Sequence, residues 1–445
     1  MKNKERVLKP LGKIKGGIKV PHHKTTSEFE SIVLAPPEKV IISMSQHIGA
    51  PCEPTVSVGD KVFVGSVVGD SAAFISAPIH SSVSGEVSEI TTIRMPAGNE
   101  VKAVVITSDG EMTPDPEIKP PKVETVDDLV AAARASGLVG LGGAGFPAHV
   151  KLKPSEDKPL DTLIINGAEC EPFITSDYRE CMEHPEDILN GVYLIKKLLN
   201  IENVIIAVED NKPAAIKTLY EIAADEKRDP ADKVKLMKLK SRYPQGAEKV
   251  LIYSATKRKL PLGKLPSDIG CIVMNITSVS FLYRYIKTGM PLVTKRITVD
   301  GNAITEPKNF IAPIGTPISY VLEQAKAENP EKILMGGPMM GIAIYDTSLP
   351  VLKQNNAILA FTGNAAKSKP TTDCIRCGRC LRACPMGLTP ASVDLAVKNP
   401  KVDELNALNV MYCIECGSCA FCCPAGRPLT AVMRLAKNEV RKAGK

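Results

Sequence analysis

The middle of the chain alternates short apolar runs with longer amphipathic stretches. Three runs rich in Val, Ile, Leu and Met predict buried parallel strands at residues 162–166, 204–208 and 271–276. Helical patterns precede and separate them, at residues 127–135, 185–199 and 212–224. Because strands and helices alternate in this way, the region is predicted to form an α/β layer around a parallel sheet.

The flanking regions show other patterns. Residues 35–106 are rich in Val, Ile, Gly and Ser, and segments 58–69 and 77–87 resemble the two halves of a lipoyl- or biotinyl-type barrel-sandwich. No lysine stands in the turn that would carry a swinging arm, so we interpret this region as structural. Residues 294–344 follow the order strand, helix, strand, and a Lys/Ser/Pro stretch at 367–370 predicts a linker.

Together these patterns predict a multidomain α/β and α+β protein. Its expected parts are a barrel-sandwich domain at 1–120, an α/β domain at 121–290, a small α+β domain at 291–360 and a cysteine-rich domain at 361–445. The chain ends in a basic amphipathic helix that carries Arg427, Arg434, Lys437, Arg441, Lys442 and Lys445. Two interpretations stay open for it: docking on a membrane surface or an acidic partner, or a solvated terminal helix.

Composition narrows the function classes. A net charge of +7 over 445 residues is too weak to indicate nucleic-acid binding, and with 4% aromatics and no Trp there is no obvious stacking platform for bases. The N-terminus lacks an apolar signal segment, and the longest uncharged run, 269–283, is shorter than a membrane span. We therefore expect a cytosolic chain without a transmembrane segment, in which 13 cysteines indicate metal or redox chemistry.

Eight cysteines form two copies of one pattern, C-x2-C-x2-C-x3-C-P. They are Cys374, Cys377, Cys380 and Cys384, followed by Pro385, and Cys413, Cys416, Cys419 and Cys423, followed by Pro424. The spacing is typical of bacterial ferredoxins with two [4Fe–4S] clusters, because three close thiolates can wrap a cubane from one loop. The alternative, a pair of structural zinc sites, would use paired CxxC units instead. The doubled pattern therefore predicts one-electron transfer.

In each copy the fourth cysteine lies on the following turn and is expected to face the other cluster. One cluster is therefore assigned to Cys374, Cys377, Cys380 and Cys423, and the other to Cys413, Cys416, Cys419 and Cys384. The neighbouring Cys422 is interpreted as a packing residue, although a register swap with Cys423 stays open.

A glycine-rich loop precedes the first predicted strand of the α/β domain. Its four glycines are Gly140, Gly142, Gly143 and Gly145. They would let backbone amides approach a phosphate, with Lys151 as a nearby cation. The loop matches G-x-G-x-x-G, but it follows a predicted helix, so the ordinary dinucleotide fingerprint fails. Glu169 and Glu171 lie just past the first buried strand, where α/β folds place ligands.

The middle domain resembles the NADH-binding flavoprotein subunit of respiratory complex I. The matching residues are GGAGFP at 142–147 with Lys151, NGAECEP at 166–172 with Asp177 and Arg179, and, more weakly, 246–248 and Asn275. The departures from the family pattern are Leu141, Ala168 and Ala247. They affect the expected NADH site more than the expected FMN phosphate site.

This resemblance implies that the glycine loop and Lys151 hold the phosphate of FMN, and that two asparagines meet the flavin. Phe146, Glu171 and Glu248 would line the NADH site, with the two glutamates as catalytic candidates. Besides the glycines, the implied cofactor-binding residues are Phe146, Lys151, Asn166, Glu169, Glu171, Glu248 and Asn275. FMN is also expected because a hydride carries two electrons, whereas each cluster accepts one.

Residues 16–24, GGIKVPHHK, resemble the opening motif of the RnfC family, the NADH-facing component of the Rnf complex, and residues 294–344 resemble a soluble-ligand-binding β-grasp domain. The domain order over the whole chain is similar to that of RnfC. The resemblance implies an NADH-dependent, FMN-containing electron-transfer component of a membrane ion-pumping ferredoxin:NAD oxidoreductase. It would lie peripherally at the cytoplasmic face of the cell membrane, with the other Rnf subunits as partners and ferredoxin reached indirectly.

Two other functions stay open. The cobalamin reductase of diol-utilising bacteria is related, but its ferredoxin segment precedes its β-grasp segment, whereas Cys374 follows that segment here. A carrier or scaffold protein without its own flavin is the second, because Leu141 and Ala168 depart from the flavoprotein pattern. His22 and His23 suggest a metal site, but no cysteine or carboxylate lies near them in sequence, so packing or surface roles are favoured.

Overall fold

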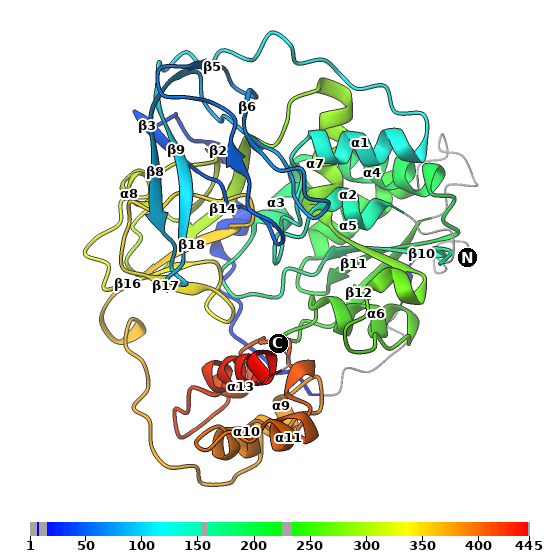
Figure 1. Cartoon of the computed structure of the whole chain (residues 1–445). Helices are drawn as coiled ribbons and strands as arrows, with labels where there is room; N and C mark the ends of the chain where they lie inside the picture. The colour runs from blue at the N-terminus through cyan, green and yellow to red at the C-terminus, as the bar shows by residue number, and fades with distance from the viewer. Residues whose placement is uncertain (1–6, 9–15, 154–157, 225–233, 444–445) are drawn as a thin grey trace.

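The computed structural model describes residues 7–8, 16–153, 158–224 and 234–443 (Figure 1). Its α/β unit contains a five-stranded parallel sheet in the order β1 (Val7–Leu8), β12 (Lys235–Leu239), β11 (Asn203–Glu209), β10 (Thr162–Gly167) and β13 (Cys271–Asn275). The three strands predicted from apolar runs are confirmed. Strand β13 stops one residue early because the Asn275 side chain caps the helix that begins at Ile276.

Helices cover both faces of this sheet, as buried parallel strands require. Leu163 and Ile165 of β10 belong to the apolar cluster on one face, and Ile164 belongs to the cluster on the other, in keeping with the two-residue period of a strand. The predicted helices are confirmed as α1 (Val126–Ala135), α4 (Pro185–Leu198) and α5 (Pro213–Ala223). The unit also contains α2 (Ala148–Leu152), α3 (Ser176–Glu183), α6 (Glu248–Thr256), η3 (Pro266–Ile269) and α7 (Ile276–Thr288).

The barrel-sandwich unit has two small sheets that enclose one apolar core. The first contains β3 (Lys39–Ser43), β9 (Glu100–Ser108), β8 (Gly85–Arg94) and β5 (Lys61–Val62), and the second β4 (Glu53–Pro54), β6 (Val67–Asp70) and β7 (Ile79–His80). Ser82, in the turn where a swinging-arm lysine would stand, is buried and donates a hydrogen bond to the Ile314 carbonyl. The turn packs against the neighbouring unit, in agreement with a structural role.

The third unit is a mixed six-stranded sheet. Its order is β17 (Ile342–Ile344), β16 (Lys332–Met335), β18 (Ala357–Phe361), β14 (Thr294–Asp300), β15 (Lys308–Pro313) and β2 (Ile32–Val33), with helix α8 (Ile318–Gln324) packed on it. The edge strand β2 comes from the N-terminal region and pairs in parallel with β15. The division that assigns residues 1–120 to one domain stays a prediction, and within this range the backbone of β1 and β2 pairs with edges of two other sheets.

Residues 16–33, which we call the strap, connect three units of the molecule. At its start, the Gly17 amide donates to the Ala383 carbonyl of the C-terminal lobe, 2.9 Å away. Ile18 then pairs with Tyr243 of the α/β unit, and the strap continues through η2 (Thr25–Glu28) into β2 of the third unit. This path connects the C-terminal lobe to the α/β unit and to the six-stranded sheet of the third unit.

The C-terminal lobe lies below the other units in Figure 1 and follows a long connection that contains the predicted linker. It consists of α9 (Arg379–Ala383), α10 (Pro390–Ala396), α11 (Val402–Ala407), η5 (Val410–Tyr412), α12 (Ser418–Phe421) and α13 (Leu429–Ala443), whereas η4 (Gly363–Ala365) lies before the linker, next to β18. The terminal helix α13 buries Met433 and Ala436 in the lobe's own core, while Arg434 and Lys437 pair with Glu415. No helix in the described part of the chain is long and apolar enough to cross a membrane.

The close approach of Gly16 to the C-terminal lobe gives a first prediction. Gly16 has φ +75°, and a Cβ there would overlap the carbonyl oxygen of Cys384, so Gly16→Ala should lower the thermal unfolding midpoint by several degrees. Gly110→Ala is the matched control, because Gly110 has φ +80° but open space around it, leaving only a left-handed backbone cost of about 1 kcal/mol. Calorimetry that shows equal shifts for both variants would contradict a tight strap contact.

Candidate functional site

The glycine loop is exposed at its middle residues. Its ends are joined by the Gly140 amide, which donates to the Phe146 carbonyl at 2.9 Å, and Gly142 and Gly143 are exposed. A Cβ at Gly143 would meet no atom within 4 Å, whereas one at Gly142 would overlap the Asn275 amide group. The loop therefore combines free backbone with a close approach to β13, which suits a phosphate-bearing cofactor.

Lys151 lies beside this loop, but its ammonium group already has partners. Its Nζ is 3.3 Å from the Glu248 carboxylate and 3.1 Å from the Val273 carbonyl. The structure thus brings together two residues that were expected to have separate roles. Because Glu248 neutralises Lys151, a phosphate that binds Lys151 would meet the glutamate's charge as well as the lysine's.

The two expected flavin-contacting asparagines lie next to each other at the ends of neighbouring strands. Asn166 of β10 stands opposite Asn275 of β13 in the sheet register. The Asn166 side chain donates to the Gly246 carbonyl at 2.8 Å, and that of Asn275 donates to Asp177 at 2.8 Å. Asp177 also accepts from Thr277 at 2.7 Å, so both of its oxygens orient groups around Asn275. This edge of the sheet is therefore a fixed polar surface.

Glu169 binds a backbone amide at the start of helix α3 through its carboxylate. Its carboxylate accepts from the amide of Asp177 at 2.6 Å, at the start of α3, where the helix dipole favours a negative charge. Burial raises the pKa of Glu169, and the nearby ammonium of Lys24 opposes that rise. The sequence placed Glu169 among the cofactor-binding residues, but in the structure its carboxylate is used to hold α3 in place.

Two lysines that sequence reasoning missed, half-buried Lys24 and buried Lys212, hold the loop after β10. Lys24, in the strap, donates to the backbone carbonyls of Glu169, at 3.0 Å, of Glu171, at 2.8 Å, and of Ile174. Lys212 donates to the Ala168 carbonyl at 2.7 Å. Burial lowers the pKa of Lys24, and Glu169 opposes that effect. The only sequence signal for Lys24 was its place at the end of the GGIKVPHHK motif.

The two histidines of the strap have packing roles. The ring of His23 stacks on that of Phe173, with centroids 4.7 Å apart and an interplanar angle of 12°. His22 lies 3.1 Å from the side-chain amide of Asn211, and its carbonyl accepts from the Phe173 amide. Both histidines thus fasten the strap to the loop after β10.

Glu171 joins this loop to the third unit and to Tyr243, which also contacts the C-terminal lobe. Its carboxylate accepts from the Met339 amide at 3.0 Å and lies 3.2 Å from the Tyr243 hydroxyl. The same hydroxyl is 2.7 Å from the Cys416 carbonyl, and one hydroxyl proton serves one acceptor at a time. Burial raises the pKa of Glu171 to about 7, although these hydrogen bonds favour the charged form. Glu171 and Glu248 therefore have different partners and different surroundings.

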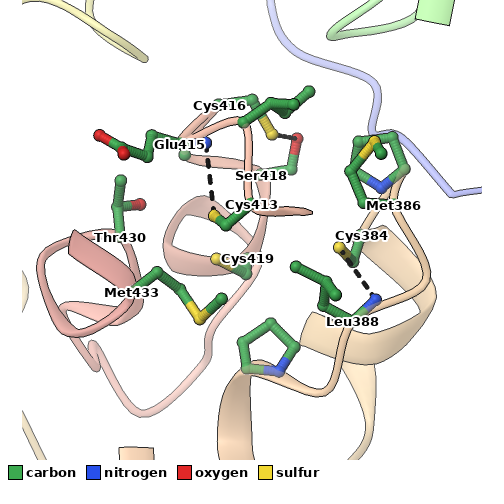
Figure 2. A pocket seen from close by; sticks show the side chains of 14 residues that line it. Cys384, Met386, Leu388, Cys413, Glu415, Cys416, Ser418, Cys419, Thr430 and Met433 are labelled. Atoms are coloured by element: carbon green, nitrogen blue, oxygen red, sulfur yellow. Dashed lines mark hydrogen bonds between the residues drawn. The ribbon is translucent and has the colours of Figure 1, made fainter. Parts of the chain in front are cut away.

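Two cavities in the C-terminal lobe are each lined by four cysteines. Figure 2 shows the first, where Cys384 comes from one side and Cys413, Cys416 and Cys419 from the other. The backbone amides of Leu388 and Glu415 donate to the sulfurs of Cys384 and Cys413, both at 3.4 Å. The second cavity is lined by Cys374, Cys377, Cys380 and Cys423.

The two quartets differ in exposure. Cys374 and Cys377 are exposed, whereas Cys416 is buried against Val20 of the strap and Tyr243. Cys422 donates to the Cys419 carbonyl and lines neither of these two cavities. Four soft sulfur donors around one space suit an iron–sulfur cubane, so the residues present fit the group that the sequence pattern predicts.

Three parts of the chain match families of known proteins. Residues 12–111 match the family described as the RnfC barrel sandwich hybrid domain, residues 133–284 the Nuo51 FMN-binding domain, and residues 373–427 the 4Fe-4S dicluster domain. The C subunit of the proton-translocating ferredoxin:NAD(+) oxidoreductase complex of Clostridium ljungdahlii is 40% identical, over 98% of this chain and 95% of the relative.

Two further relatives are also C subunits of ion-translocating complexes. The C subunit of the Na(+)-translocating ferredoxin:NAD(+) oxidoreductase complex of Acetobacterium woodii is 41% identical, over 96% of this chain and 97% of the relative. The C subunit of the ion-translocating oxidoreductase complex of Rhodobacter capsulatus is 36% identical, over 86% of this chain and 75% of the relative. Among solved structures, an NAD+-reducing [NiFe]-hydrogenase is 17% identical with a TM-score of 0.48, over 63% of this chain and 54% of that chain.

The environment of Glu171 gives a second prediction. A carboxyl group with a folded-state pKa near 7 and an ordinary value of 4.5 contributes stability that is fully present below pH 4.5 and is lost as pH rises through 7. Over this pH range the free energy of unfolding should fall by about 3 kcal/mol on account of Glu171. Glu171→Gln should not show this fall, because the amide never ionises. The urea concentration that half-unfolds Glu171→Gln, taken relative to the wild-type value, should therefore be higher at pH 8 than at pH 5. The exposed Glu89→Gln is the control, and a Glu171→Gln difference that does not change with pH would contradict this environment.

Proposed function

The chain belongs to the RnfC family of Rnf complex subunits, and from this membership we propose that it is the NADH-oxidising or NAD+-reducing electron-transfer component of a membrane ion-pumping ferredoxin:NAD oxidoreductase. The observation that carries the proposal is the pair of four-cysteine cavities, one of which packs directly against the flavin-type α/β unit. Electron exchange with NADH or NAD+ needs a flavin-type unit and sites that accept one electron each, and the two cysteine quartets would supply those sites.

FMN is the proposed flavin. Its phosphate would lie on the glycine loop near Lys151, and Asn166 and Asn275 would meet its ring. When bound, FMN supplies the exchange between two-electron hydride chemistry and one-electron transfer. The chain's own contribution is a fixed polar edge and a backbone cradle, since Asp177 orients Asn275 and the strap orients the loop after β10.

The nicotinamide nucleotide would bind near Phe146, Glu171 and Glu248. Phe146 is half-buried and Glu248 is partly exposed at the N-terminus of α6, so both border the glycine loop and its lysine. Glu171 is half-buried, and its partners are the Met339 amide and the Tyr243 hydroxyl, which also lies close to the Cys416 carbonyl of the C-terminal lobe. We therefore propose that Glu248 contacts the nucleotide and that Glu171 acts where the nucleotide site meets the clusters.

Two [4Fe–4S] clusters are proposed in the two cavities. The quartet of Cys384, Cys413, Cys416 and Cys419 is the inner one, because Tyr243 and Val20 cover Cys416 and join it to the α/β unit. The quartet with Cys374 and Cys377 is the outer one, because these thiols are exposed. Electrons would pass between the flavin site and the exterior through the inner quartet and then the outer quartet.

The proposed setting is the cytoplasmic face of the cell membrane, where other subunits would provide the ion path and the contact with ferredoxin. The alternative is a carrier or scaffold protein without its own flavin. Leu141 and Ala168, the departures that suggested it, are both buried in apolar clusters, so both side chains have a packing role.

Lys151 gives a third prediction. Lys151→Gln should lower FMN affinity by at least tenfold, because charge-assisted hydrogen bonds to phosphate contribute about 1.5–3 kcal/mol. Iron and sulfide contents should stay unchanged, since the cysteines lie in another lobe. The matched variant Glu248→Gln removes the partner of Lys151 and should retain FMN. Equal FMN affinity in wild type and Lys151→Gln, measured by fluorescence quenching, would remove Lys151 from the phosphate site.

The crossed quartets give a fourth prediction. Cys384→Ala should damage the cluster held by Cys413, Cys416 and Cys419 and leave the other, so that EPR of the reduced protein loses one of two signals. The adjacent pair of Cys422 and Cys423 supplies the control, because Cys422→Ala should retain both clusters whereas Cys423→Ala should lose the outer one. Loss of the outer cluster in Cys384→Ala would show that the quartets are not crossed.

The proposed function is tested by NADH oxidation with ferricyanide as acceptor. The full chain, loaded anaerobically with FMN, iron and sulfide, should show this activity without any membrane partner, because the nucleotide, flavin and cluster sites all belong to this chain. Ion transport should need the other subunits. A fully loaded chain that does not oxidise NADH at all would overturn the proposal in favour of a carrier role.

A further inference from the structure

Lys295 of β14 brings a buried ammonium group from the third unit to the glycine loop. Its side chain is buried, and its Nζ donates to the Leu141 carbonyl at 3.1 Å. The Leu141 amide donates to the Ser278 hydroxyl, also at 3.1 Å, so the residue before Gly142 is held on both sides. Residue 295 lies outside the stretch 133–284 that matches the FMN-binding domain, so that match gives Lys295 no role.

The charge of Lys295 has no counter-ion among the described residues, where no carboxylate forms an ion pair with its Nζ. The carboxylates that act on it most strongly, those of Asp177 and Glu180, are engaged elsewhere. Glu180 pairs with two arginines, and Asp177 accepts from Asn275 and Thr277. Burying a charge without a partner is costly, and an anion bound at the glycine loop would offset that cost.

The peptide group between Leu141 and Gly142 faces Lys295 with its oxygen. In a trans peptide the C=O and N–H bonds point in opposite directions, so the Gly142 amide points away from the buried ammonium group. Gly142 is exposed, and no residue in the described part of the chain accepts a hydrogen bond from its amide. A positive charge on the oxygen side polarises the peptide and makes its N–H a better donor. Lys295 therefore strengthens an amide that is free to bind an anion.

We propose that Lys295 is a second cation for the phosphate group of the proposed FMN, and that it determines a preference for FMN over flavins without a phosphate. This role rests on the proposed function, because it takes FMN as the ligand of the glycine loop. Lys151 alone does not balance a phosphate dianion, since the Glu248 carboxylate lies 3.3 Å from its ammonium group. The charge of Lys295 is buried, so its attraction for the phosphate is weakly screened by solvent and salt.

The charge of Lys295 should make FMN binding depend on pH. Burial lowers the pKa of Lys295 to about 8, with a smaller lowering from Arg296 on the same strand, whereas Asp177, Glu180 and Glu169 raise it. A bound phosphate favours the charged ammonium, so its contribution to affinity is fully present below pH 8 and is lost as pH rises above that value. The phosphate stays a dianion in this range, because its second pKa is about 6. FMN binding above pH 8 should therefore take up a proton.

The test compares FMN with riboflavin, which has the same ring system and no phosphate. The Kd of the full chain, loaded with iron and sulfide, is measured for both flavins by fluorescence quenching at pH 7.5 and pH 9.5. Calorimetry in buffers of different ionisation enthalpy measures proton uptake. The wild-type preference for FMN should fall about tenfold or more between these pH values, with proton uptake on FMN binding. Riboflavin should show neither effect.

Three variants locate the effect. Lys295→Met keeps a long side chain without the charge, so at pH 7.5 it should weaken FMN binding about tenfold or more and change riboflavin binding less than about twofold. Lys295→Arg carries a charge that does not titrate, so it should keep the preference for FMN and lose its pH dependence. Lys353→Met is the matched control, because Lys353 is another buried lysine, and its Nζ donates to the Pro78 and Gly137 carbonyls outside the glycine loop, both at 2.7 Å. It should keep both the preference and the pH dependence.

Several outcomes would overturn this role. Equal losses of FMN and riboflavin affinity in Lys295→Met would leave Lys295 only a part in the conformation of the loop. A wild-type preference that is the same at pH 7.5 and pH 9.5 would show that its charge does not act on the phosphate, and this measurement needs no variant to fold. A wild-type chain that prefers FMN, with the same preference in Lys295→Met, would overturn the role of Lys295 and leave the proposed function intact. Binding of neither flavin by the wild type would instead overturn the flavin assignment of the proposed function, and the role of Lys295 with it.

Discussion

The buried ammonium group of Lys24 holds the loop on which the proposed functional sites depend. Its donations to the carbonyls of Glu169, Glu171 and Ile174 fix the segment that follows β10. Buried carbonyls must be satisfied, and in this segment a lysine from the strap does what a sheet or helix would do elsewhere. Because the strap also touches the C-terminal lobe and ends in β2, the same residues set the position of the cluster lobe relative to the α/β unit.

A second buried charge network fixes the third unit to the α/β unit. Glu180 of α3 is fully enclosed and pairs with Arg284 of α7 and Arg296 of β14. Burial alone would raise the pKa of Glu180, but the two guanidinium groups outweigh it and lower the pKa to about 2. Burying these charges has a desolvation penalty, and the loss of any one partner would leave a buried charge unpaired. The network therefore favours one arrangement of the two units over others. The α/β unit and the third unit are thereby held in one geometry.

The distribution of burial around the cysteines also has a functional consequence. The inner quartet is covered by Tyr243 and the strap, and the outer quartet opens onto solvent. The inner quartet therefore lies nearer the proposed flavin site, and the outer quartet is the one accessible from outside. This asymmetry supports the proposed order of the two clusters.

The sequence by itself determined the elements and the family. Apolar runs of the right length predicted β10, β11 and β13, and the doubled cysteine pattern and the glycine loop indicated the chemistry, because these signals are local in the chain. Only the tertiary structure decided which residues meet. The roles of Lys24 and Lys212 could not be predicted, since a lysine that donates to distant carbonyls looks like any surface lysine in sequence. The pairing of Lys151 with Glu248, the capping role of Glu169 and the exposure of only one quartet likewise arise from contacts between segments far apart, which no pattern of neighbouring residues encodes.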